Sequence, residues 1–317
     1  MSYINSVVDK VYVINLDKDT ERLASIDRQL RGCNVTYERF SGVIGKHIGF
    51  DERLTPFCAQ FCTDGIKGCA LSHRSIWQQA IENKYETILI LEDDANLPPN
   101  FQEKVRDVLQ RVPEEWEVIF LGCRMFCQDK YAVSKIGNRV LGMKAEEYDG
   151  DIHSVKGTVG AHAILYKKSF LERVIDEPIS THFDIHVTQM VQKYNAKAYG
   201  LHPEVVNLHE DNSVNSNLSD SFPPMANYVL NLYKVVDYPI GWGMSENFMK
   251  VAGFNINLLL VILMLVVAFA PPQGLLVLAV WLVGEWVVSR DTKNFVRFVV
   301  LLGAVFGARV AIRKGKL

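Results

Sequence analysis

The feature that most limits how this chain can fold is a long uncharged, mostly apolar run near its C-terminus. From Val251 to Ala270 the sequence reads VAGFNINLLLVILMLVVAFA, without an Asp, Glu, Lys or Arg. At about 1.5 Å per residue, a helix of this length covers the roughly 30 Å hydrocarbon core of a bilayer. The run therefore predicts a membrane-spanning helix.

Two further apolar stretches follow this run. The Pro-Pro-Gln-Gly segment at 271–274 breaks the helix, because proline lacks a backbone N–H and clashes with the preceding turn, and an apolar stretch then continues to residue 289. Within it, Glu285 is expected to reach the membrane interface in a structural role. We predict two spans, about 251–270 and 274–289, and a third helix at about 295–312 that is interfacial or spanning.

Charge also divides the chain near residue 250. The residues after 250 hold 7 of the 34 Lys and Arg but 2 of the 36 Asp and Glu, so they carry a net charge of +5 against −7 for the rest. We expect a folded domain at 1–215, a linker rich in turn-forming residues at 216–250 and a membrane tail at 251–317. No basic patch of the kind that binds nucleic acid is present.

The N-terminus lacks the uninterrupted apolar stretch of a signal peptide. The basic C-terminal end is expected to stay in the cytosol. An even number of crossings then places the folded domain on the cytoplasmic face as well. The six cysteines are an even number that could form disulfides, but free thiols are expected because that compartment is reducing, and a metal site is the alternative.

Hydrophobic periodicity predicts alternating strands and helices in the folded domain. Short β-branched and apolar runs predict strands, and apolar residues three and four apart predict helices. The expected strands are 10–16, 36–40, 87–91, 116–122 and 160–166, and the expected helices include 69–83, 101–112, 169–175 and 184–194. This order is typical of an α/β sandwich with a mainly parallel sheet.

An acidic triplet, Glu92, Asp93 and Asp94, follows the predicted strand 87–91 directly. Ligands of open α/β sheets collect at the carboxyl ends of strands. On an extended backbone Glu92 and Asp94 point to the same side, where two carboxylates can share a hard divalent cation that neutralises a diphosphate. The competing interpretation is a solvated strand end or a helix cap.

Four sequence blocks resemble glycosyltransferase family 25, which includes lipooligosaccharide and procollagen galactosyltransferases. They are VYVINLDKDTERL at 11–23, RFSGVIG at 39–45, KGCALSHRSIWQQAI at 67–81 and ILILEDDA at 88–95, with a fainter match in GTVGAHAILYKKSF at 157–170. The resemblance covers roughly residues 8–215. It implies a GT-A-like nucleotide-sugar-binding fold, a donor such as UDP-galactose, inverting transfer, and Mn²⁺ or Mg²⁺ held by Glu92 and Asp94.

The resemblance also implies a donor site. A helix beginning at Gly68 would favour a phosphate ligand at its N-terminus. Donor contacts are expected from Asn15, Asp17, Arg22, Gly68, Ser72, His73, Arg74 and Asp93. The alternatives are a turn and cap for Asn15 and Asp17, surface pairing for Arg22 and packing for His73, and Cys69 is expected to fill a small space in the core.

An inverting transfer needs one base to remove the proton of the acceptor hydroxyl. Asp184, in THFDIHVTQ, resembles the family's later acidic position, although a helix N-cap is an alternative interpretation. His209 is expected to complete the metal site. The implied acceptor is a glycan, a glycolipid or a hydroxylated protein near membrane lipid.

Two other functions compete with a hexosyltransferase. A nucleotidyltransferase or phosphodiesterase would use the same acidic site. A non-catalytic membrane scaffold would bind a nucleotide-sugar or glycan, which the intact Glu-Asp-Asp triplet disfavours.

Overall fold

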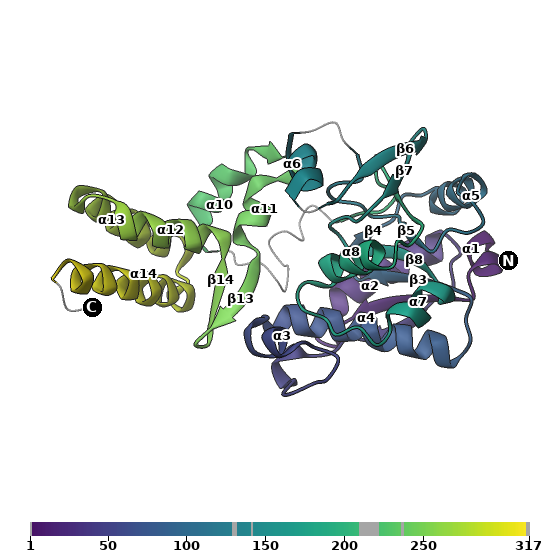
Figure 1. Ribbon diagram of the computed structural model, residues 1–317, viewed down its shortest axis with the longest axis horizontal. Coiled ribbons are helices and arrows are strands. Elements are labelled where there is room, and N and C mark those ends of the chain that lie inside the picture. The colour runs from purple at the N-terminus through teal and green to yellow at the C-terminus, as the bar shows by residue number, and fades with distance from the viewer. Residues whose placement is uncertain (1, 129–131, 141, 209–221, 236–237, 315–317) are drawn as a thin grey trace. The chain divides into compact units, whose positions relative to one another are not determined.

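The structure is a computed structural model that describes residues 2–128, 132–140, 142–208, 222–235 and 238–314. The chain divides into two compact units, Met1–Asn212 and Ser213–Leu317, and each is described by itself (Figure 1).

The N-terminal unit is built on an eight-stranded mixed sheet with the order β2-β1-β3-β8-β5-β9-β7-β6. The strands are β1 (Lys10–Asn15), β2 (Glu38–Ser41), β3 (Thr87–Glu92), β5 (Val118–Phe120), β6 (Ala145–Asp149), β7 (Ile152–Val155), β8 (Ala163–Lys167) and β9 (Ala198–Leu201). β7 and β8 pair antiparallel with both of their neighbours, whereas the other pairings are parallel. Six of the eight strands therefore run in one direction, as a mainly parallel sheet requires.

Helices cover both faces of this sheet (Figure 1). On one face α1 (Tyr3–Val7), α2 (Thr20–Gly32) and α5 (Phe101–Arg111) pack in one apolar cluster with Leu89 and Leu91 of β3. On the other lie α4 (Asp64–Glu82), α7 (Lys168–Val174) and α8 (Phe183–Lys193), where Trp77 of α4 packs edge-on against Tyr166 of β8. The smaller elements are η1 (Gly45–His47), α3 (Pro56–Phe61), β4 (Ala95–Asn96), α6 (Ala132–Val140) and β10 (Asn207–Leu208).

Alternation along β3 explains which way its last residue points. Leu89 and Leu91 belong to the cluster on the α2 and α5 face. Successive side chains of a strand point to opposite faces, so Glu92 points to the face that α4 covers. The strand ends at Glu92, and Asp93 and Asp94 form a turn. The predicted extended backbone through Asp94 is therefore wrong.

Four of the six cysteines form disulfides, which corrects the expectation of free thiols. Cys58 pairs with Cys62 and Cys123 pairs with Cys127. Cys33 and Cys69 are free.

The C-terminal unit combines small β-elements with apolar helices. Its elements are α10 (Pro224–Asn231), β11 (Lys234–Val235), β12 (Tyr238–Pro239), α11 (Ile240–Ser245), β13 (Asn247–Val251), β14 (Phe254–Asn257), α12 (Leu258–Phe269), α13 (Pro272–Ser289) and α14 (Thr292–Arg313). The segment 216–250, predicted as a linker, thus contains helices and strands. The first predicted span begins inside a β-hairpin, and its helix starts at Leu258, where the Asn257 side chain accepts the Leu260 N–H at 2.9 Å.

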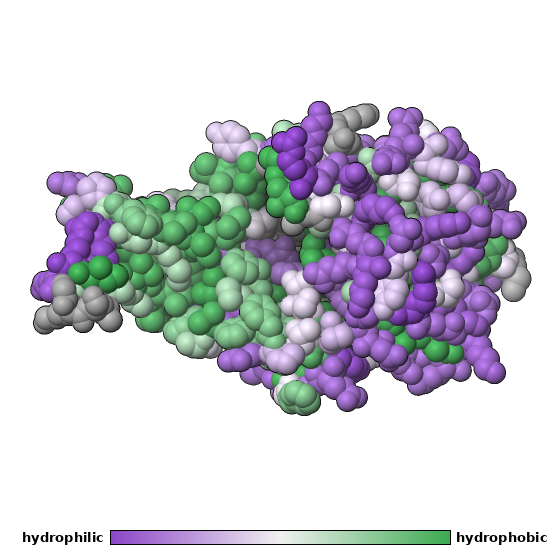
Figure 2. Space-filling view, in the orientation of Figure 1, coloured by the Kyte–Doolittle hydropathy of each residue, from purple (hydrophilic) through white to green (hydrophobic). Residues whose placement is uncertain are grey.

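Two of these helices, α13 and α14, are long and apolar enough to cross a membrane, and α12 is a shorter apolar helix. Figure 2 shows hydrophobic residues over the face of α12, α13 and α14 that the view presents. Glu285 of α13 is buried and accepts the N–H groups of Met225 and Ala226 at 2.7 and 2.9 Å. This carboxylate therefore satisfies backbone donors at the first turn of α10, a structural role.

Candidate functional site

The candidate site lies where β1 and β3 end. The two strands are parallel neighbours, and Ile14 of β1 is opposite Glu92 of β3. Asn15 and the acidic triplet therefore meet at one edge of the sheet, as parallel pairing requires.

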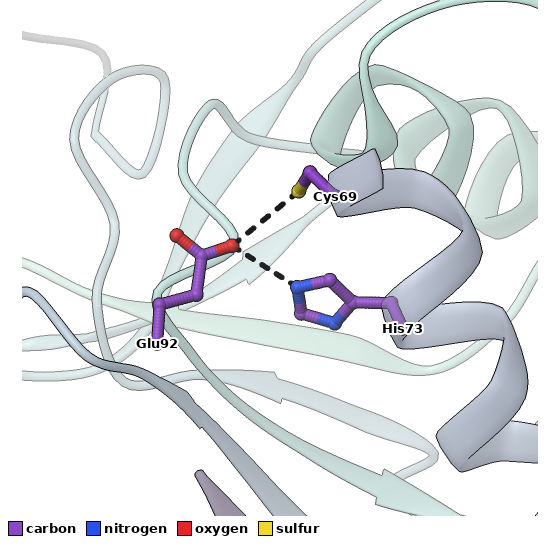
Figure 3. A group of neighbouring side chains, drawn as sticks. All are labelled: Cys69, His73 and Glu92. Atoms are coloured by element: carbon purple, nitrogen blue, oxygen red, sulfur yellow. Dashed lines mark hydrogen bonds and ion pairs between the residues drawn. The ribbon is translucent and has the colours of Figure 1, made fainter. Parts of the chain in front are cut away.

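Glu92 faces helix α4 and contacts two of its side chains (Figure 3). The Oε1 atom lies 3.0 Å from His73 Nε2 and accepts a hydrogen bond from Cys69 Sγ at 3.6 Å. His73 is buried and its ring stacks on Phe183 of α8, with 4.1 Å between the ring centroids. Burial acts to raise the pKa of Glu92, but the hydrogen bond and charge of His73, together with contributions from His162 and Cys69, lower this pKa.

Asp93 points instead toward α2. Its two oxygens accept hydrogen bonds from Asn15 Nδ2 at 2.7 Å and Arg22 NH1 at 2.9 Å. Burial raises the pKa of Asp93 despite these partners. Asn15 is itself buried, and its amide is satisfied there: it also donates to the Asp19 carbonyl and accepts from Arg39 Nε, both at 2.9 Å. Asn15 therefore joins β1, β2 and the acidic turn.

Asp94 lies close to a second carboxylate. Burial, followed by the negative charge of Glu92, raises the pKa of Asp94 to about 7. The Arg22 NH2 group, 3.7 Å from Asp94 Oδ2, opposes this shift. The negative charge of Glu92 thus disfavours ionisation of Asp94. A bound divalent cation would stabilise the ionised forms of both carboxylates, so the pair is suited to bind one.

Asp17 is an exposed carboxylate at the rim of this site. Its Oδ1 atom accepts a hydrogen bond from Ser41 Oγ at 2.9 Å and forms a close ion pair with Arg39. Hydrogen bonding by Arg39 lowers the pKa of Asp17. Its side chain is 70% exposed, so a bound ligand can reach it.

Helix α4 begins earlier than the sequence predicts, so the expected helix N-terminus at Gly68 is wrong. The helix starts at Asp64, because the Thr63 side chain accepts the Ile66 N–H and caps it. A Cβ at Gly68 would lie 2.5 Å from the Val43 carbonyl oxygen. Gly68 therefore lets the Arg-Phe-Ser-Gly-Val-Ile-Gly segment, 39–45, pack directly on α4.

Ser72 and Arg74 also make structural contacts. The Ser72 hydroxyl accepts the Val43 N–H at 2.8 Å and donates to the Gly68 carbonyl at 2.7 Å. Arg74 is buried and donates to the Val174 carbonyl of α7 at 2.9 Å. Of the α4 residues predicted to bind the donor, His73 is the one that contacts the acidic triplet.

Asp184 lies in the first turn of α8, two residues after its N-cap position. Its oxygens accept the N–H groups of Gly160 at 2.9 Å and Ile185 at 2.7 Å. Burial raises the pKa of Cys69 well above its usual value, and the charges of Glu92, Asp184 and Asp94 add to this effect. Three carboxylates from two separate segments, the acidic triplet and α8, therefore act on one thiol. His209 lies outside the described residues.

Two residues at this site were not predicted. Arg124, just after β5, is close enough for its positive charge to oppose the rise in the pKa of Asp94. Burial lowers the pKa of His162, and the charge of Arg124 adds to that effect. Cys69, expected to be core filling, contacts Glu92. The sequence contains a signal for Cys69, because it precedes His73 by four residues and so shares its helix face.

Sequence comparison identifies relatives of this unit. The model of glycosyltransferase family 25 (LPS biosynthesis protein) matches residues 8–148. A putative glycosyltransferase, R655, of Acanthamoeba polyphaga mimivirus is 31% identical over 36% of this chain and 37% of its own length.

Two animal relatives carry contrasting names. Human procollagen galactosyltransferase 2 is 22% identical over 62% of this chain and 34% of its own length. A Rattus norvegicus protein named a probable inactive glycosyltransferase 25 family member 3 is 27% identical over 36% of this chain and 22% of its own. The chain thus spans about a third or less of the length of these curated relatives. Residues 8–148 of its N-terminal unit match the model of glycosyltransferase family 25, which confirms the resemblance that the sequence blocks predict.

Proposed function

We propose that the chain is a membrane-attached, metal-dependent, inverting glycosyltransferase with a GT-A-like fold. It moves a hexose, with galactose from UDP-galactose as the favoured donor, onto a glycan, a glycolipid or a hydroxylated protein. The observation that carries the proposal is the convergence of Glu92, Asp94 and Asp184 beside Cys69 in a family 25 domain. The name of the human relative supports galactose.

Glu92 and Asp94 would hold Mn²⁺ or Mg²⁺. The fit rests on the burial of Asp94 and on the repulsion between the two carboxylates, which a cation would relieve. When bound, the ion would neutralise charge on the departing diphosphate. His209 stays a predicted third ligand.

Asp184 would act as the base that takes the proton from the acceptor hydroxyl. The two backbone N–H groups on its oxygens fix the direction of the carboxylate. A single oriented carboxylate is sufficient for this step, because inversion needs one base.

Donor contacts are assigned by exposure. Asp17 would contact the nucleotide from the rim, and Arg22, between Asp93 and Asp94, would approach the phosphates. The other predicted donor residues are mostly buried, so we assign them the role of shaping the site behind the donor. They are Asn15, Gly68, Ser72, His73, Arg74 and Asp93.

Membrane attachment would come from α13 and α14. We place the N-terminal unit on the cytoplasmic face, because Arg313 ends the last helix, Lys314 follows it, and basic ends stay inside. The two disulfides favour an oxidising compartment instead. Protease digestion of sealed vesicles distinguishes these orientations, since digestion of the N-terminal unit from the cytoplasmic side is expected only for the first.

The reaction is tested with the full chain in detergent and a panel of labelled UDP-sugars, with and without Mn²⁺. We expect metal-dependent transfer of the sugar, lost in Glu92→Gln and in Asp94→Asn and kept in Glu103→Gln, at an exposed position of α5. Transfer of the nucleotide would instead identify a nucleotidyltransferase. Donor binding without turnover would identify the scaffold, the alternative that the name of the Rattus norvegicus relative favours.

A further inference from the structure

We propose that Cys69, His73 and Glu92 form a binding site for a thiol-seeking transition-metal ion, with Zn²⁺ as the favoured occupant. The ion shares Glu92 with the Mn²⁺ or Mg²⁺ site of the proposed function. Zinc bound there is therefore an inhibitor of transfer. This inhibition rests on the proposed function, whereas the binding site itself does not.

Helix geometry brings the first two ligands together. Cys69 and His73 are four residues apart on α4, so their side chains lie on one helix face. Glu92 comes to the same face because β3 alternates and ends there. Two packed elements therefore present a thiol, an imidazole and a carboxylate to one point.

The separations of the ligand atoms suit a small cation. Glu92 Oε1 lies 3.0 Å from His73 Nε2 and 3.6 Å from Cys69 Sγ, and the three ligand atoms lie within 4.8 Å of one another. Zinc bonds of about 2.0–2.3 Å in tetrahedral geometry place ligand atoms roughly 3.3–3.8 Å apart. Small side-chain adjustments thus suffice to bind the ion.

The chemistry of the ligands selects the ion. Mg²⁺, Ca²⁺ and Mn²⁺ prefer oxygen ligands, whereas thiolate and imidazole favour zinc-class ions. Three protein ligands leave a fourth tetrahedral position for water or an inhibitor. The Glu92 side chain is 26% exposed, so an ion can reach the site from solvent.

The shared carboxylate explains the competition. Oε1 of Glu92 receives both contacts from α4, and its second oxygen points away from the helix (Figure 3). An ion bound by Cys69 and His73 would hold Glu92 against α4. It would also add positive charge beside Asp94, which disfavours a second cation there.

Cobalt absorption tests the site without any enzymatic assay. Cys33 and Cys69 are the two free cysteines, since the other four form disulfides. We expect the full chain in detergent, titrated with Co²⁺ and no reductant, to show a thiolate-to-cobalt charge-transfer band that Zn²⁺ abolishes. The band should persist in Cys33→Ser and disappear in Cys69→Ser. Absence of the band in the unmodified chain, or its persistence in Cys69→Ser, overturns the proposal.

Two further measurements complete the test. His73→Gln, which keeps the thiol, should weaken Zn²⁺ binding by about 100-fold or more, because loss of a direct ligand exceeds the 10–100-fold typical of outer-shell changes. Unchanged Zn²⁺ affinity in His73→Gln would also refute the site. In transfer assays Zn²⁺ should inhibit the unmodified chain and Cys33→Ser at least about 10-fold more tightly than Cys69→Ser. A cobalt band in a chain without transferase activity would refute the proposed function and leave the metal site intact.

Discussion

Replacing Asp94 by Asn should stabilise the metal-free protein at high pH. The pKa of Asp94 is about 7 in the folded chain against an ordinary value of 3.8. Because the folded-state pKa is raised, ionisation of Asp94 destabilises the fold. The penalty is absent below pH 3.8, grows as pH rises and is complete above pH 7. Asn has nearly the same shape and never carries the charge.

The size of this effect follows from the pKa difference. A shift of about 3 pKa units corresponds to about 4 kcal/mol, which is an upper limit because the penalty is shared with Glu92. For a domain of 150–250 residues, that limit corresponds to a rise in Tm of about 8–16 °C.

Thermal unfolding of the full chain in detergent with EDTA, at pH 8 and at pH 4, measures the difference. Asp94→Asn should raise the Tm at pH 8 and leave it nearly unchanged at pH 4. The exposed Asp17, whose pKa is lowered by Arg39, supplies the control. Asp17→Asn should change the Tm little, and in the opposite direction. Equal stabilisation by Asp94→Asn at both pH values would refute this account.

Three further changes test other parts of the structure. Gly68→Ala should lower the stability of the N-terminal unit by about 1–3 kcal/mol in thermal unfolding, because the new methyl group meets the Val43 carbonyl; Gly32→Ala, with open space around it, should not. Asp184→Asn should reduce transfer by about 10²–10⁴-fold and leave donor binding unchanged, whereas equal loss of both would contradict its role as base. Glu285→Ala should leave two N–H groups of α10 without their acceptor and lower the stability of the C-terminal unit by about 1–3 kcal/mol. Hydrogen exchange in α10 should become faster, and unaltered exchange would contradict this role.

Local patterns in the sequence predict most elements of the N-terminal unit. The strand predicted at 87–91 is β3, Thr87–Glu92, and the helix predicted at 101–112 is α5, Phe101–Arg111. These predictions succeed because period-2 and period-3.6 apolar patterns express the burial of one face or stripe. The acidic triplet is likewise predicted at a strand end, since charged residues end a buried strand.

Sequence periodicity also has a clear limit in this chain. The apolar run from 251 predicts a continuous helix, but Ala252 and Gly253 have positive φ values and turn the chain between β13 and β14. A hydropathy window cannot detect this turn, because the hairpin and the helix share the same apolar composition.

The tertiary structure alone decides which partner each carboxylate meets. Sequence spacing groups Glu92 with Asp94. In the fold, alternation along β3 directs Glu92 to Cys69 and His73 of α4, and the turn after β3 directs Asp93 to Asn15 and Arg22. Asp184 joins them from α8, some ninety residues later. The physical reason is that local sequence determines whether a segment forms a helix or a strand and which of its faces is buried. Which buried faces pack against each other depends on contacts between segments far apart in the chain.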